Sequence, residues 1–496
     1  MKLQDLIQKE FPEVADQCLS FSMQWKNSEV SGISSDSRCI QPGWIFVAIP
    51  GNKVDGRSFI AQALQRGAIA IVMPNSDVLQ KFAELDYSGM PILFVDNIRK
   101  FLSIIASRLY GNHPDIIFAI TGTSGKTSVA SFVRQICQYA GFSAAQIGTT
   151  GIISSQYKDD NSLTTPDPVY LAQTLSRFSS QGVTHVSIEA SSHGLDQHRL
   201  DAVQLSAGAF TNLGRDHLDY HETMQAYFKA KMRLFEELLP KGSPAIVFAD
   251  DAWSDEVMIR ARKSGCHVLS VGSKGTFVHL KKIVRRDDKQ EITLSVEGET
   301  FNINFPLCGE FQVQNALVAA GLCIATGIDI AVVIKALETL GVVSGRLELV
   351  HRTVNGGRIY VDYAHNPSSL KSLLENVRIF TSGRIILVFG CGGERDQGKR
   401  LLMGQISLQL ADVVIVTDDN PRSEDPQKIR SEIINGSDLF IEEGDRREAI
   451  RKAISMLRSD DVLVVAGKGH ETIQIGSGNI TVGFSDSGII CEILGY

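Results

Sequence analysis

The chain has 496 residues, too many for a single hydrophobic core, and its length favours about three domains. Hydrophobic residues make up 43% of it and charged residues 21%, an ordinary balance for a soluble globular protein. The net charge of −7 gives no electrostatic reason to expect nucleic acid or an anionic membrane as a partner.

The sequence shows no membrane or export segment. No apolar run reaches the roughly 18–20 residues that a bilayer-spanning helix needs. The first residues, Met1–Asp5, carry early charges and are not followed by the long apolar core of a signal peptide. The eight cysteines are scattered without a C-x-x-C pair, which indicates reduced thiols. We therefore expect a cytoplasmic protein without membrane insertion.

Residues 1–111 are expected to form a first, small domain. Strands are predicted at Ile45–Ile49 and Ala68–Val72, with a helix at Ser58–Gln65 between them. A linker is predicted at Gly111–Pro114, because its proline biases the preceding residue away from helix.

Residues 112–344 open with the most informative motif of the chain. The apolar strand Ile116–Ile120 leads into a glycine-rich turn that ends at Thr127, where a helix is predicted to start. Such a turn presents backbone N–H groups and a helix N-terminus to a phosphate, while Lys126 adds a positive charge and Thr127 a hydroxyl for Mg²⁺. Ile120 occupies the place of the first glycine of the usual eight-residue P-loop. The motif therefore predicts a nucleotide site of a shortened type.

Polar residues follow the later strands of this segment. Glu189 comes directly after the predicted strand Thr184–Ile188, and a second strand is predicted at Leu205–Phe210. Because Mg²⁺ prefers carboxylate and hydroxyl oxygens, Glu189 is a candidate metal ligand beside the phosphate loop. His217 is expected near the metal or a reacting carboxylate. Zinc is not expected, since no cysteine or carboxylate set completes the pair of His217 and His221.

The stretch Glu222–Leu239 is predicted to be one helix with a lysine on its apolar face. Apolar side chains recur on one face at helical spacing, and Lys231 lies in the middle of that face. Lys229, Arg233 and Glu236 are predicted on the opposite face. An ordinary lysine would avoid the apolar face or extend out of it. A buried lysine with a depressed pKa is a nucleophile that can attack CO₂ to form a carbamate.

Residues 345–496 are expected to form a third domain around another parallel sheet. Gly390–Gly393 does not continue into a dinucleotide fingerprint, because Arg395 stands at the third glycine position, so hydride transfer is not expected. Polar clusters again follow the strands. Ligands bind at the carboxyl ends of strands in open α/β sheets, so both sheets are expected to face a shared cleft. The strands are predicted at Arg358–Val361, Arg384–Phe389, Asp412–Val416 and Asp461–Ala466.

Taken in order, six runs of this sequence resemble those of the Mur ligase family. The resemblance covers essentially the full length, and it implies an α/β fold with three domains. These would be a small α/β UDP-binding domain (1–111), a central P-loop-type doubly wound ATPase domain (112–344) and a C-terminal Rossmann-like domain (345–496). The runs are Thr121–Thr127, Glu189–His193, Thr211–His221, Gly345–Glu348, Asp362–Pro367 and Gly467–Glu471.

The resemblance also implies roles for individual residues. Catalytic roles fall to Lys126, Glu189, His217 and Lys231, with Lys231 carbamylated, and Mg²⁺ would be held by Thr127, Glu189 and His217. ATP contacts are implied at Gly122, Thr123, Ser124, Gly125, Lys126, Thr127, Asn315, Arg346 and His365. The UDP-linked substrate would meet Ser37, Thr164, Thr165, Ser191, Ser192, Gln197 and Arg199. The amino-acid pocket would comprise Arg395, Asp419, Asn420, Arg422, Gly467 and Glu471.

Two positions depart from the family pattern. Ser124 stands where the family often has Asn, in a loop that works mainly through its backbone. Gln312 also stands where Asn is common, so an ATP contact by this residue is not implied.

The implied activity is ATP-dependent amide ligation in peptidoglycan precursor synthesis. The γ-phosphoryl group of ATP would pass to the terminal carboxylate of UDP-MurNAc-L-Ala-D-Glu, and the amine of meso-diaminopimelate would displace phosphate. The run Asp419–Arg422 favours diaminopimelate, since Arg422 and Arg395 can pair with the distal carboxylate that lysine lacks. Glu471 would hold the distal ammonium. The implied protein is a monomer with no nucleic-acid partner.

Three alternatives stay open at this point. One is the homologue that adds lysine, and another is a ligase resembling folylpolyglutamate synthetase, which shares the shortened loop. The third is a nucleotide-gated binding protein without ligase activity, which would keep the loop but would not need Lys231.

Overall fold

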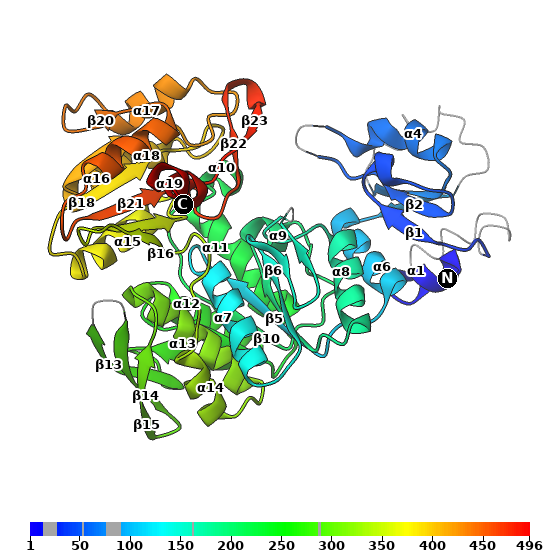
Figure 1. The fold of residues 1–496 in the computed structure, drawn as a ribbon. Coiled ribbons are helices and arrows are strands. Elements are labelled where there is room, and N and C mark those ends of the chain that lie inside the picture. The colour runs from blue at the N-terminus through cyan, green and yellow to red at the C-terminus, as the bar shows by residue number, and fades with distance from the viewer. Residues whose placement is uncertain (13–26, 52–53, 76–90, 161–162, 286–288) are drawn as a thin grey trace.

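The structure is a computed structural model that describes residues 1–12, 27–51, 54–75, 91–160, 163–285 and 289–496 (Figure 1). Three large sheets follow one another along the chain, each with its own helices. The predicted three-part α/β fold is confirmed. Within the described residues no helix is long and apolar enough to cross a membrane. The cysteines there are free thiols, and Cys18 lies outside the described residues.

The first sheet is parallel, with the strand order β1-β2-β3-β4. The predicted helix is shorter than expected, because Asp55 accepts a hydrogen bond from the Arg57 N–H and caps a 3₁₀ turn, Gly56–Phe59, ahead of it. The strands are β1 (Gly32–Ser34), β2 (Trp44–Val47), β3 (Ala68–Pro74) and β4 (Ile92–Val95), and the helices are α1 (Leu3–Gln8), α4 (Ile60–Gln65) and α6 (Ile98–Tyr110).

The second sheet runs in the order β15-β14-β13-β12-β11-β10-β5-β9-β6-β7-β8. Its central strands are parallel, and the pairs at both edges are antiparallel. The strands are β5 (Ile116–Thr121), β6 (Ala144–Gly148), β7 (Gly151–Ile153), β8 (Lys158–Asp159), β9 (His185–Glu189), β10 (Ala207–Phe210), β11 (Pro244–Phe248), β12 (His267–Gly272), β13 (Val278–Arg285), β14 (Gln290–Val296) and β15 (Glu299–Phe305).

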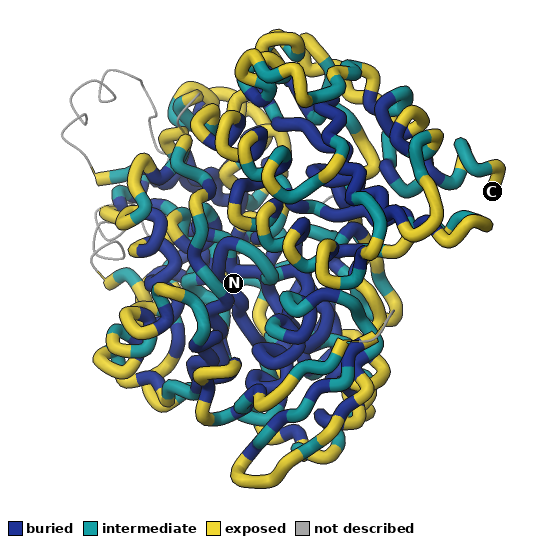
Figure 2. The backbone as a smooth tube through the Cα atoms, turned by 90° about the vertical axis from the view of Figure 1, so that its left-hand side faces the viewer, coloured by how far each residue is buried: buried dark blue, intermediate teal, exposed yellow. Residues whose placement is uncertain are grey.

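Helices cover both faces of this sheet, as a doubly wound fold requires. One face packs against α7, α13 and α14 and the other against α8, α9, α11 and α12. The central strands β5, β6, β9, β10 and β11 are therefore buried, in the dark-blue interior of Figure 2. The helices, with the short α10, are α7 (Lys126–Tyr139), α8 (Pro168–Ser180), α9 (Ser192–Asp196), α10 (Leu218–His221), α11 (Met224–Arg233), α12 (Ser254–Lys263), α13 (Glu310–Ala325) and α14 (Ile330–Leu337).

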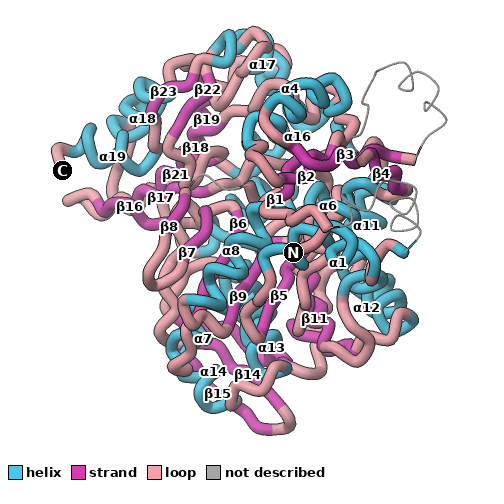
Figure 3. The backbone as a smooth tube through the Cα atoms, turned by 90° about the vertical axis from the view of Figure 1, so that its right-hand side faces the viewer, coloured by secondary structure: helices cyan, strands magenta, loops and turns pink. Residues whose placement is uncertain are grey.

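The third sheet has the order β16-β17-β21-β18-β19-β20, parallel except at β16. Figure 3 shows β16, β17, β21, β18 and β19 in this order. A hairpin of β22 (Ile473–Ile475) and β23 (Thr481–Gly483) projects from it. The strands are β16 (Glu348–Arg352), β17 (Arg358–Asp362), β18 (Ile385–Phe389), β19 (Val413–Val416), β20 (Ile441–Glu442) and β21 (Val462–Ala466). The helices are α15 (Pro367–Ile379), α16 (Gly398–Leu410), α17 (Pro426–Ile434), α18 (Arg446–Ser455) and α19 (Asp486–Leu494).

The helix expected over Glu222–Leu239 is present: it begins at Met224 with α11 and continues without a break through Leu238. Glu222 adopts a left-handed φ of 62° between α10 and α11, and Leu234–Leu238 forms a π-helical turn. Arg233 is predicted on the face opposite the apolar side chains, but its side chain is nevertheless buried against α9 and donates from Nη2 to Asp201 Oδ2 at 3.0 Å. A carboxylate on the neighbouring element thus makes burial of this arginine possible.

Candidate active site

The phosphate loop connects β5 to α7 and depends on two glycines. Gly122 has a φ of +140°, and a Cβ there would lie 1.9 Å from Thr211 Oγ1. Gly125 has a φ of +88°, and a Cβ there would lie 2.3 Å from Asn315 Oδ1. Ser124 donates its N–H to Asn212 Oδ1 at 2.9 Å. The close approach of these neighbours fixes the loop backbone, which is the part that holds phosphates.

Lys126 and Lys231 lie side by side at this loop. Lys126 Nζ donates to the carbonyls of Gly122 and Thr123 at 3.0 and 2.8 Å. Lys231 is 1% exposed, and its Nζ donates to Gly122 O at 2.7 Å above the ring of Tyr227. Burial, together with the neighbouring Lys126 ammonium, holds the pKa of Lys231 well below its ordinary value. The predicted burial of this lysine is confirmed.

Glu189, the last residue of β9, is buried beside the first turn of α7. Its Oε2 accepts from the hydroxyls of Thr127 at 3.1 Å and Thr149 at 3.0 Å. Its Oε1 accepts from the Thr149 N–H at 2.8 Å. Gly148 permits this contact, since a Cβ there would lie 2.1 Å from Oε1. The carboxylate is therefore fixed by hydrogen bonds on both oxygens.

His217 and Asp216 form the wall facing the third sheet. Burial, with smaller effects from nearby histidines, lowers the pKa of His217 to about 3, so its imidazole is neutral. Burial acts to raise the pKa of Asp216, but the hydrogen bond from His365 and the charges around it hold it well below its ordinary value. Asn366 Nδ2 donates to Asp216 Oδ2 at 3.1 Å. This anionic carboxylate thus connects the two sheets.

Arg346 lies at the start of the third segment and reaches the phosphate loop. Its Nη2 donates to Thr127 Oγ1 at 2.8 Å, and its guanidinium lies over the Tyr363 ring. Gln312 on α13 is 1% exposed and donates from Nε2 to Arg346 O at 2.9 Å. Gln312, which departs from the family pattern, therefore supports the backbone of Arg346.

A cavity of about 700 Å³ collects many of the predicted site residues from both sheets. Arg395 reaches it from the third sheet, and within the described residues Arg395 has no ion pair. The predicted residues that line the cavity are Thr123, Ser124, Gly125, Lys126, Thr127, Thr164, Thr165, Glu189, Ser191, Arg199, His217, Asn315, Arg346, His365 and Arg395.

The residues predicted to contact the UDP-linked substrate lie partly in the cavity and partly outside it. Thr165 Oγ1 donates to Glu189 O at 2.6 Å, and Arg199 Nη1 donates to Thr165 O at 2.6 Å. Ser192 and Gln197 lie on α9 and its C-terminal end without lining the cavity. Ser37 lies in the first sheet's unit, buried and hydrogen-bonded to Gln62, and does not line the cavity either.

Most of the predicted amino-acid pocket forms a second cluster at the carboxyl ends of β19 and β21. Asn420 Nδ2 donates to Glu471 Oε2 at 3.1 Å. Lys468, fully buried, donates from Nζ to Glu471 Oε2 at 2.8 Å and to Asn420 Oδ1 at 3.1 Å. Arg422 Nη1 donates to Gly393 O at 2.8 Å. Of the predicted set, only Arg395 lines the main cavity; the residues that do not are Asp419, Asn420, Arg422, Gly467 and Glu471.

Sequence reasoning missed Thr149, Asp216 and Lys468. Thr149 follows the buried strand β6, and a polar residue after an apolar strand was the signal available for it. Asp216 and Lys468 stood inside recognised motifs, but nothing in their type separates a ligand contact from a support for one.

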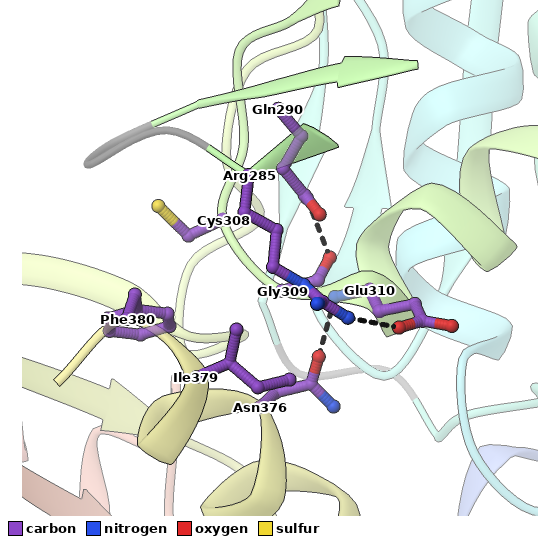
Figure 4. A pocket seen from close by; sticks show the side chains of 8 residues that line it. All are labelled: Arg285, Gln290, Cys308, Gly309, Glu310, Asn376, Ile379 and Phe380. Carbon is purple, nitrogen blue, oxygen red and sulfur yellow. Dashed lines mark hydrogen bonds and ion pairs between the residues drawn. The ribbon is translucent and has the colours of Figure 1, made fainter. Parts of the chain in front are cut away.

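A small pocket elsewhere between the second and third sheets shows how α15 is attached (Figure 4). The Glu310 N–H donates to Asn376 Oδ1 at 2.6 Å, and Arg285 Nη2 donates to Glu310 Oε2 at 2.9 Å. The first bond joins the start of α13 to α15, whose own N-terminus carries Asn366 at the main cavity, and the second joins α13 to β13.

Comparisons with known proteins give one consistent result. The sequence matches the Mur ligase family, catalytic domain, over residues 29–110, the Mur ligase middle domain over 120–323, and the Mur ligase, glutamate ligase domain over 345–469. It is 54% identical over 466 residues to the UDP-N-acetylmuramoyl-L-alanyl-D-glutamate–2,6-diaminopimelate ligase of Brucella melitensis, covering 94% of each chain. It is 51% identical over 495 residues to the protein of that name from Rhizobium meliloti, covering 100% of each.

A solved structure agrees. The structure of a UDP-N-acetylmuramoyl-L-alanyl-D-glutamate–2,6-diaminopimelate ligase superposes with a TM-score of 0.69 at 30% sequence identity, covering 100% of this chain and 99% of the other. The likeness thus extends over all three sheets.

Proposed function

This chain belongs to the Mur ligase family, and we propose that it uses ATP to join meso-diaminopimelate to the D-glutamate carboxylate of UDP-MurNAc-L-Ala-D-Glu. One observation carries the proposal: the cavity holds the phosphate loop of the second sheet and Arg395 of the third. A nucleotide and a carboxylate-bearing substrate can therefore meet in it. This activity belongs to peptidoglycan precursor synthesis.

The chemistry runs in two steps. The carboxylate oxygen attacks the γ-phosphorus, and the bond from that phosphorus to the oxygen bridging to the β-phosphate breaks. ADP departs, and the substrate carboxylate has become an acyl phosphate. The neutral amine then attacks the acyl carbon, and the tetrahedral intermediate expels phosphate while the nitrogen loses a proton. Lys126 lies where it can neutralise charge on the transferring group, and Arg346 offers a planar donor beside it.

The residues present fit Mg²⁺. The Thr127 hydroxyl and the Glu189 carboxylate, 3.1 Å apart and buried, are the oxygen donors that this ion takes from proteins. No described cluster offers three or more histidine, cysteine or acidic ligands, which suits an ion that keeps water and substrate phosphates. Thr127, Glu189 and His217 would hold the metal, and the bound ion would supply charge neutralisation at the phosphates.

We assign carbamylation to Lys231. Its nitrogen is buried and meets a carbonyl rather than a carboxylate, which favours a neutral amine. The amine adds to CO₂, a carbon–nitrogen bond forms, and one proton leaves. The product replaces a neutral amine beside Lys126 with an anion that can support the metal site.

We also propose the domain boundaries and the residues that contact each substrate. We place the domain boundaries at 1–111, 112–344 and 345–496, in the gaps between the sheets. Ser37 would contact the UDP group, while Thr164, Thr165, Ser191, Ser192, Gln197 and Arg199 would contact the sugar portion. Arg395, Arg422 and Glu471 would bind diaminopimelate. We expect a cytoplasmic monomer.

The test is ADP release with ATP, the UDP-dipeptide and one amino acid at a time. Release with meso-diaminopimelate, and little with lysine or glutamate, is the expected result. Release only with lysine would identify the lysine-adding activity, and release only with glutamate would identify the folate-type ligase. Nucleotide binding without release in any mixture would identify a binding protein.

A further inference from the structure

His470 of the third sheet contacts the backbone of the second sheet beside the phosphate loop. Its Nε2 lies 3.0 Å from Thr149 O. Burial, with the nearby Arg346 charge, lowers the pKa of His470 to about 4, so the ring is neutral. A carbonyl oxygen can only accept, so Nε2 carries the ring proton and donates it.

This hydrogen bond leaves the other ring nitrogen unsatisfied. Nδ1 of His470 is buried and has no hydrogen-bond partner among the described residues. An unpaired buried acceptor costs free energy, so packing alone gives no reason for a histidine at this place. The Nε2 contact is the interaction that distinguishes it from an apolar ring.

Thr149 is hydrogen-bonded to the Glu189 carboxylate at the phosphate site. Its N–H donates to Glu189 Oε1 at 2.8 Å and its hydroxyl to Oε2 at 3.0 Å. Thr127 donates to the same Oε2 at 3.1 Å. A shift of the Thr149 backbone would therefore turn Glu189 relative to the phosphate loop.

In the chain, His470 is next to Glu471 of the predicted amino-acid pocket, and it also lies against Gly345, at the start of the third segment. The next residue, Glu471, is paired with Lys468 and Asn420. Gly345 packs so closely on this loop that a Cβ there would lie 2.2 Å from the backbone nitrogen of His470. The residue after Gly345 is Arg346, so the loop packs against the segment that carries the Arg346 donor to Thr127.

We infer that His470 is a positioning residue that couples occupation of the amino-acid pocket at Glu471 to the alignment of Glu189 at the phosphate site. The inference rests on the proposed function. An amino acid that fixes the 467–471 loop fixes the His470–Thr149 bond, and Thr149 then holds Glu189 for the nucleotide. Because binding free energies are linked, the nucleotide must raise the amino acid's affinity by the same factor.

The experiment measures the affinity of a non-hydrolysable ATP analogue for the full chain, with the UDP-dipeptide present, with and without meso-diaminopimelate. In the wild type we expect the amino acid to tighten the analogue about fivefold or more. His470→Phe keeps a ring but has no donor, so diaminopimelate should no longer tighten analogue binding, and the ratio of the two affinities should fall to about one. His470→Gln places an amide N–H near Nε2 and should restore most of it. His267→Phe, at an exposed histidine, is the matched control.

The outcomes separate this inference from the proposed function. A wild type that binds the analogue and diaminopimelate without coupling overturns the inference alone. The inference is also overturned if diaminopimelate tightens analogue binding in the His470→Phe variant as much as in the wild type. It is overturned as well if the His470→Gln variant is as uncoupled as the Phe variant. A wild type that fails to bind diaminopimelate overturns the proposed function and the inference together. Diaminopimelate affinity without nucleotide should stay within about twofold in the variants, as expected for a residue that does not contact it.

Discussion

Arg346 and Thr127 are joined by a hydrogen bond of 2.8 Å from Nη2 to Oγ1. This bond brings the start of the third segment onto the first helical turn after the phosphate loop. The guanidinium is also held 4.4 Å from the Tyr363 ring centroid, so contacts from two sheets orient one planar donor. The phosphate site is therefore completed only when the second and third sheets lie together.

Arg346→Lys should retain the charge and lose the orientation. A lysine can neither stack on Tyr363 as a plane nor present a fork of donors. We expect kcat/KM for ATP to fall about 10²-fold, the cost of removing an aligned donor. Steady-state kinetics with varied ATP measure this. Arg352→Lys, at the exposed last residue of β16, should leave kcat/KM unchanged, and a similar loss there would mean that the effect is general.

Gln312→Asn should weaken ATP binding through Arg346. The shorter side chain cannot reach Arg346 O, which Gln312 now meets at 2.9 Å. We expect KM for ATP to rise up to about tenfold, since one hydrogen bond contributes about 1 kcal/mol. The KM for diaminopimelate should be unchanged. Equal increases in both constants would contradict a role confined to Arg346.

Much of the site could be predicted because its chemistry is local in sequence. The strand, turn and helix around Lys126 are consecutive, and the apolar spacing around Lys231 is enough to predict that this lysine is buried. Contacts that cross between sheets could not be predicted in this way. The bond from Arg346 to Thr127 spans 219 positions, and that from His470 to Thr149 spans 321.

The errors have physical causes as well. Arg233 lies on the side of the helix opposite the apolar residues, yet it is buried because the Asp201 carboxylate, in the turn that follows α9, neutralises its charge. The strand β14 alternates buried and partly buried residues, a period-two signal, and we did not predict it. Glu222 ends a helix through a left-handed φ of 62° that its residue type does not favour.

Lys231→Ala should remove the carbamate and most of the activity. A group that supports a metal site typically contributes about 10–100-fold, so kcat should fall by that factor or more. In ¹³C NMR with labelled bicarbonate, the wild type should show a carbamate signal that the variant lacks. Lys229→Ala, exposed on the same helix, is the control. A wild type without the signal would contradict the modification.

The free energy of unfolding should fall between pH 7 and pH 5, with His221 contributing. Burial, followed by the neighbouring His193, lowers its pKa from 6.5 to about 4, and its Nε2 has no partner among the described residues. The unfolded chain therefore binds a proton first as the pH drops below about 6.5, which favours unfolding. Urea denaturation at both pH values measures the change. His221→Phe should reduce the slope, and an unchanged slope would contradict the assignment.

The central claim is that the substrate carboxylate is phosphorylated before the amine attacks. The most direct measurement uses UDP-MurNAc-L-Ala-D-Glu labelled with ¹⁸O in the terminal carboxylate, together with ATP and meso-diaminopimelate. Each released phosphate is expected to carry one ¹⁸O atom, because the carboxylate oxygen that attacked the γ-phosphorus leaves with it. Phosphate released without ¹⁸O while the amide accumulates would contradict it.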